Sequence, residues 1–330
     1  MIKNVQKIII IIIKKILNLF KIPIDFFFFI VLIPSSLIML FYRKFGSHKL
    51  PISKKVLNFI GIFPLTDHYY EPQFNFKKLN KNFNKDRNLT GINFCLNNQL
   101  HNLSNLIYKN ELIELKLEKN SPNYNFNIHN SFFERGDAEI YYQLIRQLQP
   151  KNILEIGSGH STLIALEAIK KNKEIHGAYT KITCVEPYEN DWLKDLNVNV
   201  LRKKIEDVDE KYYLNLKNGD ILFIDSSHII RPQGDVLKIF LEIVPRLNKG
   251  VLIQIHDIFT PKDYPEKWVI KENKFWNEQY LVESIIMNNN NYEIYLMLNY
   301  LKNKAYKELK DVCPYLKKST EPGSIYLLKK

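Results

Sequence analysis

The sequence predicts an α/β fold in which seven short strands alternate with helices and form a doubly wound, mostly parallel sheet. Three observations lead to this prediction: short apolar runs that end in acidic residues, helical segments between those runs, and a strand–glycine–helix turn near the middle of the chain. The chain has 330 residues. One such domain needs roughly 200–250 residues, so we expect additional segments outside it.

The strand–glycine–helix turn lies within residues 151–161. A short apolar run ends at Gly157 and Gly159, and a helix that we expect Ser161 to cap follows. Because glycine has no side chain, such a turn lets a nucleotide-like ligand approach the backbone closely. Glu155, inside the strand, suits a ligand with a cationic end better than a pyrophosphate. The turn therefore predicts a cofactor site.

Six further strands complete the predicted sheet. We expect them over residues 181–186, 198–201, 220–225, 251–257, 292–298 and 324–328, with helices over 235–247 and 277–288. Ligands of open α/β sheets bind at the carboxyl ends of the strands. An acid at the end of the second strand, Glu186, is placed to bind ribose hydroxyls.

At this point residues 131–330 resemble the class I S-adenosylmethionine-dependent methyltransferases. The residues that carry the resemblance are Glu155-x-Gly157-x-Gly159-x-Ser161, Glu186, Glu206-Asp207 after the third strand, and Asp225 after the fourth. Residues 223–228 and 256–265 resemble a bacterial branch of that superfamily with an N-terminal membrane segment. The resemblance implies S-adenosylmethionine (SAM) as the cofactor and an antiparallel final pair of strands.

The resemblance also implies roles for individual residues. Glu155, Gly157 and Gly159 would hold the methionine part of SAM, Glu186 the ribose, and Asp207 or Glu206 the adenine amino group. The remaining members of the implied cofactor-binding set are Ser158, Ser161 and Asp225. The alternative for Glu186 is a solvated strand end, and the alternative for Glu206-Asp207 is ordinary loop charge.

Four polar residues are expected to converge at the ends of the fourth and fifth strands: Asp225, His228, His256 and Asp257. In one mechanism, His228 or His256 is a general base, with Asp225 beside it, because the usual histidine pKa lies near neutral pH. In the other, Asp225 and Asp257 bind a divalent metal ion, as in catechol-type O-methyltransferases. His256 replaces a hard oxygen ligand of that pattern, which would admit a softer ion.

The N-terminal residues 1–55 predict a basic, hydrophobic membrane anchor. They hold ten lysines and arginines against a single acid, Asp25, and so carry +9 of the chain's net charge of +12. Residues 22–42 are almost entirely apolar and long enough to cross a bilayer, and we expect them to be retained. Residues 8–20 suggest an interfacial basic helix. Pro34-Ser35-Ser36 leaves open a single tilted span or a re-entrant hairpin.

The rest of the chain carries little net charge, so we expect no nucleic-acid partner. Residues 56–130 are expected to form a helical and irregular cap, with helices over 100–108 and 111–117, that covers the mouth of the site. In that cap His68 could face the substrate or be structural. Asp137 could cap a helix or contact the cofactor, and Tyr264 and Trp268 could stack on an acceptor or simply pack.

Together these features predict a membrane-tethered methyltransferase that transfers a methyl group to oxygen of a small-molecule, glycan or lipid-linked acceptor. Residues 1–55 would contact membrane lipids. Because SAM is a cytosolic metabolite, the catalytic domain should face the cytoplasm at the bacterial inner membrane. Two alternatives remain at this point: an NAD-dependent oxidoreductase on a Rossmann sheet, and an inactive methyltransferase-like binding module.

Overall fold

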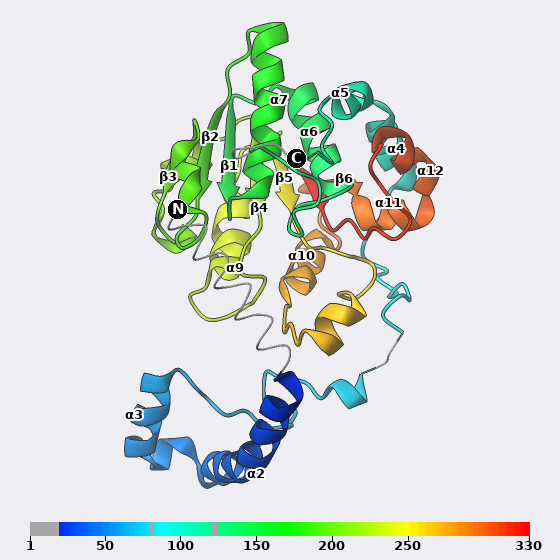
Figure 1. Cartoon of the computed structure of the whole chain (residues 1–330). Coiled ribbons are helices and arrows are strands. Elements are labelled where there is room, and N and C mark those ends of the chain that lie inside the picture. The colour runs from blue at the N-terminus through cyan, green and yellow to red at the C-terminus, as the bar shows by residue number, and fades with distance from the viewer. Residues whose placement is uncertain (1–19, 80–81, 120–124) are drawn as a thin grey trace. The chain divides into compact units, whose positions relative to one another are not determined.

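The computed structural model describes residues 20–79, 82–119 and 125–330. The chain divides into two compact units, Met1–Leu79 and Asn80–Lys330 (Figure 1). The expected interfacial helix over residues 8–20 lies, apart from Phe20, outside the described residues.

The second unit contains the predicted seven-stranded sheet. Its strands are β1 Asn152–Ile156, β2 Lys181–Val185, β3 Asn199–Leu201, β4 Ile221–Ile224, β5 Leu252–Ile255, β6 Tyr292–Met297 and β7 Ile325–Lys329. They are ordered β3-β2-β1-β4-β5-β7-β6, and β7 pairs antiparallel with both β5 and β6. This confirms the doubly wound, mostly parallel sheet and its antiparallel final pair.

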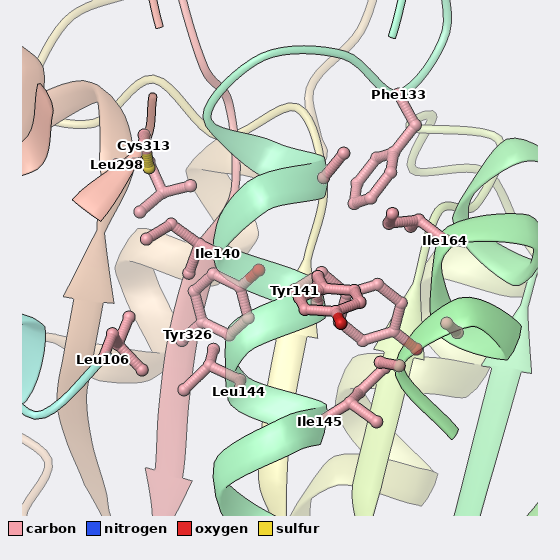
Figure 2. Close-up of a cluster of buried hydrophobic side chains, with 14 of the residues drawn as sticks. Leu106, Phe133, Ile140, Tyr141, Leu144, Ile145, Ile164, Leu298, Cys313 and Tyr326 are labelled. Carbon is pink, nitrogen blue, oxygen red and sulfur yellow. The ribbon is translucent and has the colours of Figure 1, made fainter. Parts of the chain in front are cut away.

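Alternate residues of each strand face two separate apolar layers, as the pleat of a strand requires. Ile153 and Phe223 point into the layer that holds α6 (Asp137–Leu148) and α7 (His160–His176), whereas Leu154 and Ile224 point into the other. Figure 2 shows the first layer, in which Tyr141 of α6 lies among buried side chains such as Phe133 and Tyr326. Both faces of the central strands are therefore covered, which explains their continuous apolar runs.

Most of the other helices around the sheet are short. Besides α6 and α7, the second unit holds α4 Leu96–Ser104, α5 Lys109–Glu114, α8 Lys211–Leu214, α9 Asp235–Leu237, α10 Glu278–Ile286, α11 Leu298–Lys304 and α12 Tyr306–Val312. A π-helix, Lys238–Ile243, and a 3₁₀ turn, Val244–Arg246, continue α9, so the expected helix over 235–247 is interrupted. Other single turns are Asp191–Asp195, Ile205–Asp207 and Lys267–Lys271.

Three helix starts differ from the expected ones. α4 begins at Leu96 rather than 100, because Asn93 accepts the N–H of Cys95 and Gln99 donates to the Phe94 carbonyl, which fixes an earlier first turn. α5 begins at Lys109 and ends at Glu114, before Lys116 takes a φ of +50°. α7 begins at His160, so Ser161 lies inside its first turn and does not cap it.

The first unit contains a long apolar helix, α2 Lys21–Phe45, and a shorter one, α3 Pro51–Ile60, with single turns at Ser47–Lys49 and Phe76–Lys78. Among the described residues, α2 is the one helix long and apolar enough to cross a membrane, by length and composition. It runs unbroken through Pro34, and the Ser35 hydroxyl donates to the Val31 carbonyl at 2.9 Å. The helix is therefore continuous through Pro34-Ser35-Ser36, the stretch where the sequence suggested a bend.

Candidate active site

A cavity of about 430 Å³ opens at the carboxyl ends of β1, β2 and β4. Of the predicted cofactor-binding residues, those that line it are Gly157, Ser158, Gly159, Ser161, Glu186, Glu206 and Asp225. Other residues of its wall are Phe132, Phe133, His160, Asn190, Lys204 and Arg231. The cavity lies where open α/β sheets bind their ligands.

The two glycines of the turn make room for this cavity. Gly157 has a φ of +78°, and a Cβ there would overlap the backbone oxygen of Asp225, so no larger residue fits between β1 and β4. A Cβ at Gly159 would lie 2.9 Å from the side-chain amide nitrogen of Asn190. The backbone of the turn is therefore exposed to the cavity because both side chains are missing.

Glu155, which was expected to contact the methionine part, does not line the cavity. It lies on the face of β1 that points into the α6–α7 layer, fully buried. It accepts hydrogen bonds from the hydroxyls of Tyr141 (3.2 Å) and Thr162 (2.5 Å), and Thr162 in turn accepts the N–H of Gly159 (3.2 Å). Burial raises the pKa of Glu155 to about 7. The carboxyl group therefore supports the turn from beneath.

Glu186 stands at the wall of the cavity and is held by backbone groups. It accepts the N–H groups of Tyr188 (3.0 Å) and Glu189 (2.9 Å), and the Ser158 N–H lies 3.4 Å from its other oxygen. Asn190 donates to the Ser158 carbonyl at 2.8 Å and so joins this loop to the glycine turn. Sequence reasoning missed Asn190, which has a φ of +56°; the signal in the sequence was an asparagine, a residue that tolerates this conformation, in the loop after β2.

The loop after β3 places two neighbouring acids differently relative to the cavity. Glu206 lines the cavity, whereas Asp207 is exposed and lies outside it. Both belong to the turn Ile205–Asp207, whose buried Ile205 also faces the cavity. Of these two acids, Glu206 is therefore the one that faces the cavity.

At the ends of β4 and β5 the structure brings together Asp225, His228, His256 and Asp257. His228 Nε2 lies 3.3 Å from Asp225 Oδ1 and 3.7 Å from Asp257 Oδ2. His256 Nδ1 lies 3.6 Å from one oxygen of each carboxylate. Asp225 also lines the cavity, whereas the other three do not. Asp225 therefore connects the cavity to this cluster.

A fifth residue, Glu278, orients His228. Its carboxylate lies 2.7 Å from His228 Nδ1 and also accepts the Ser226 hydroxyl at 2.7 Å, and it is fully buried at the start of α10. With Nδ1 engaged, His228 presents Nε2 toward Asp225 and Asp257. Sequence reasoning missed Glu278 because no motif relates the first residue of α10 to the end of β4.

Asp137 does not cap α6, and it does not line the cavity. Glu139, not Asp137, accepts the Gly136 N–H at the start of α6. Asp137 is buried and accepts the N–H groups of Gly323 and Ser324, next to β7. Its carboxylate also lies 3.9 Å from His256 Nε2.

Electrostatics in the cluster favour positive charge. Burial would lower the pKa of His256, but the charges of Asp257 and Asp225 outweigh it and raise the pKa to about 10. Likewise, burial opposes protonation of His228, yet hydrogen bonds to Asp225 and Glu278 raise its pKa well above the usual value. Burial raises the pKa of Asp225, but the two histidines lower it further than burial raises it. Protons on the imidazoles or a metal cation can supply this positive charge.

The donor set fits a divalent cation. One oxygen of Asp225, one oxygen of Asp257 and one ring nitrogen of His228 lie within 4.8 Å of one another. Two carboxylates and an imidazole are ligands that divalent transition metals accept, and a buried carboxylate that holds the far nitrogen of the histidine is a common feature of metal sites. The expected pair Asp225 and Asp257 is thus joined by His228, rather than by His256.

The aromatic residues after β5 mainly pack against one another. Tyr264 is 2% exposed, and its hydroxyl accepts the Gln279 N–H at 3.0 Å. The Lys274 Nζ lies 4.0 Å from the ring centroids of both Trp268 and Trp276. The ring centroids of Trp276 and His228 lie 4.1 Å apart. Tyr264 and Trp268 do not line the described cavity, so packing accounts for both.

Comparison with known proteins finds a family match over part of the second unit. Residues 154–258 match the family model described as a methyltransferase domain. Together with the strand order and the glycine turn, this match shows that the second unit contains a methyltransferase domain. Thr162 in place of a third glycine and the inserted antiparallel β7 separate it from the dinucleotide-binding alternative, whose strands follow the order 3-2-1-4-5-6.

The individual relatives are more distant. An uncharacterised protein of Archaeoglobus fulgidus is 29% identical over 175 residues, which cover 48% of this chain and 76% of that one. The O-methyltransferase from Bacillus cereus in complex with SAH is 14% identical, with a TM-score of 0.36, over 70% of this chain and 91% of that one. TomG from Streptomyces achromogenes is 11% identical, with a TM-score of 0.36, over 69% and 89%.

Proposed function

We propose that this methyltransferase is tethered to the membrane and methylates a hydroxyl oxygen of a small-molecule, glycan or lipid-linked acceptor. The observation that carries the proposal is the position of Asp225, which belongs both to the wall of the cavity and to the histidine–carboxylate cluster. A group in that position can meet a methyl donor on one side and an acceptor hydroxyl on the other.

The residues of the cavity fit SAM. The glycine turn exposes backbone where a Cβ would fill the space, and the adjacent His160 has a buried Nδ1 with no hydrogen-bond partner among the described residues. We assign the turn 157–161 to the methionine part, Glu186 to the ribose hydroxyls and Glu206 to the adenine side. Glu155 then acts on the cofactor only through the turn that it supports.

The cluster at β4 and β5 is suited to removing the hydroxyl proton. When bound, SAM supplies a methyl group activated by its sulfonium. A bond forms between the acceptor oxygen and the methyl carbon while the carbon–sulfur bond breaks, and S-adenosylhomocysteine (SAH) leaves with the electron pair. We assign the released proton to the neutral form of His256, beside Asp225; this form is favoured only at alkaline pH, because Asp257 and Asp225, despite burial, raise the pKa of the imidazole to about 10. Holding donor and acceptor in line supplies much of the acceleration in such transfers.

Asp225, His228 and Asp257 would hold a divalent metal ion, with Glu278 orienting His228. Such an ion lowers the pKa of a bound hydroxyl and orients it. One imidazole among two carboxylates allows Mn²⁺ or another transition-metal ion as well as Mg²⁺.

The anchor supports a position at the membrane. α2 spans 25 residues, or about 37 Å at 1.5 Å per residue, against a bilayer core of about 30 Å. Its large apolar side chains are exposed. Since SAM is made in the cytosol, the catalytic unit faces the cytoplasm in this proposal. An acceptor carried at the membrane would then lie within reach.

Methyl transfer can be tested with the full chain in vesicles and SAM labelled with tritium in its methyl group. Lipid, glycan and small-molecule extracts of the source cells are supplied separately, with EDTA or with Mg²⁺ or Mn²⁺. We expect label in one extract, absent with His256→Ala, while calorimetry shows SAH binding to that variant within about threefold of the parent. SAH binding without label in any extract would contradict the proposed acceptors.

The anchor has its own test. Mass spectrometry of the chain purified from membranes should find the N-terminal peptides, because the proposal requires α2 to be retained. A mature chain that begins after α2 would show that the helix is a cleaved signal sequence.

A further inference from the structure

The helix α3 carries an apolar face that the first unit leaves uncovered. Ile52, Val56, Phe59 and Ile60 recur at the i, i+4, i+7 and i+8 spacing of one helical face. Ile52 is 80% and Phe59 93% exposed, while Leu57, on another side of the helix, is buried. Such a face on so short a helix needs a partner, because water does not favour contact with it.

The positive charge of the residues around this face indicates which kind of partner would cover it. No aspartate or glutamate occurs between residues 26 and 66, whereas the same stretch contains Arg43, Lys44, Lys49, Lys54 and Lys55. Lys54 follows Ile52 by two residues and therefore lies away from the apolar face, and Lys55 lies near its border. An apolar face bordered by lysines fits a bilayer surface with anionic headgroups.

The position of α3 in the chain places it at that surface. Only residues 46–50 separate the end of α2 at Phe45 from the start of α3 at Pro51. Five residues extend at most about 18 Å, so α3 begins close to where α2 leaves the membrane. Gly61, with a φ of +81°, ends α3, and the exposed Ile62 and Phe63 follow.

We propose that α3 lies in the headgroup region of the cytoplasmic leaflet as a second membrane contact, with Ile52, Val56, Phe59 and Ile60 directed into the acyl boundary and Lys54 toward water. This inference rests on the membrane tethering proposed above. It adds an interfacial helix that binds anionic lipid, so that the chain enters the catalytic unit from the membrane surface. The occupant of the face is lipid rather than a second copy of the chain.

The test uses the full chain with Cys95→Ser, reconstituted in vesicles of phosphatidylcholine with or without about 30% phosphatidylserine. Cys184 and Cys313 are fully buried, and a preparation without an added cysteine measures any labelling of them. An environment-sensitive fluorophore is attached at Phe59→Cys, at Asn58→Cys on the polar side of α3, or at Leu32→Cys within α2. Quenching by iodide in water and by nitroxide lipids is then measured.

We expect the label at Phe59→Cys to be quenched by lipids with a shallow nitroxide and about fivefold less by iodide than the label at Asn58→Cys. Phosphatidylserine should increase this difference. Equal iodide quenching at both sites would overturn the inference. So would a Phe59→Cys label shielded from iodide but not quenched by nitroxide lipids, because protein would then cover the face. Lipid quenching at Leu32→Cys separates these outcomes from a failure of the tethering itself, in which that label too would escape quenching.

Discussion

The two halves of the site are built in different ways. The half at β1 and β2 is formed largely by backbone, since the turn 157–161 contributes glycines and Glu186 is held by main-chain N–H groups. The half at β4 and β5 is formed by charged side chains. Its groups come from the ends of two strands and from α6 and α10.

This difference implies a division of labour. A backbone cradle recognises a cofactor by shape and changes little with pH. A cluster of carboxylates and histidines can instead hold a cation and move a proton. Burying its charged groups costs free energy, so each charge needs a partner of opposite charge or a hydrogen bond. Substitutions in the first half should therefore affect SAH binding, and substitutions in the second should affect metal binding and turnover.

The largest effect is expected from Gly157→Val. A side chain at this position would overlap the Asp225 backbone and force a β-branched residue into a φ of +78°. SAH affinity should fall by more than about 100-fold, measured by calorimetry, because the turn can no longer approach its ligand. Gly177→Val is the matched control, since Gly177 has a φ of +64° and open space around it. Gly177→Val should lose stability but keep SAH binding. Equal loss of SAH binding in the two variants would show that Gly157 has no special role in binding.

Asp257→Asn tests the other half. Removing one of three candidate ligands should weaken Mn²⁺ binding by at least about 100-fold and reduce turnover to a similar degree. SAH affinity should stay within about threefold, because Asp257 does not line the cavity. EDTA should reproduce the loss of turnover in the parent, and added Mn²⁺ should reverse it. Full activity of the parent in EDTA would show that turnover needs no metal ion, and proton transfer would then be the one role left for the cluster.

A smaller effect is expected from Glu278→Gln, which keeps the shape of the side chain but removes the charge that holds His228. Loss of such an orienting carboxylate typically costs 10–100-fold in metal affinity or activity. Mn²⁺ affinity and turnover should fall together while SAH binding is kept. Glu272→Gln, in an ion pair with Lys267 outside the cluster, serves as the control. If Glu278→Gln lowered only thermal stability, Glu278 would be a structural residue.

The same division explains what the sequence could predict. The strands, the glycine turn and the polar residues that end β2 and β4 follow from local pattern, and the structure confirms their places. Glu278 and Asp137 reach the cluster only through tertiary packing of α10 and α6, which no local pattern encodes. Glu155 lies away from the cavity for a simpler reason. The alternation of β1 turns its side chain into the layer beneath α7, where Tyr141 and Thr162 satisfy it.

The smallest effect is expected at this buried acid. It separates residues of the turn 157–161, which face the cavity, from Glu155, which only supports the turn. The pKa of Glu155 is raised to about 7 in the folded chain, from an ordinary value of 4.5, so the folded state binds a proton that the unfolded state releases. Its contribution to stability is present below pH ~4.5 and is lost as the pH rises through about 7. Between pH ~6 and ~7 the free energy of unfolding of the parent should fall by about 1 kcal/mol relative to that of Glu155→Gln.

All three tryptophans lie in the second unit, so their fluorescence reports its unfolding in denaturant. Parallel stability curves for the two proteins would show that Glu155 is already ionised. SAH affinity of Glu155→Gln should fall less than about tenfold, since the acid acts only through Thr162 and the turn.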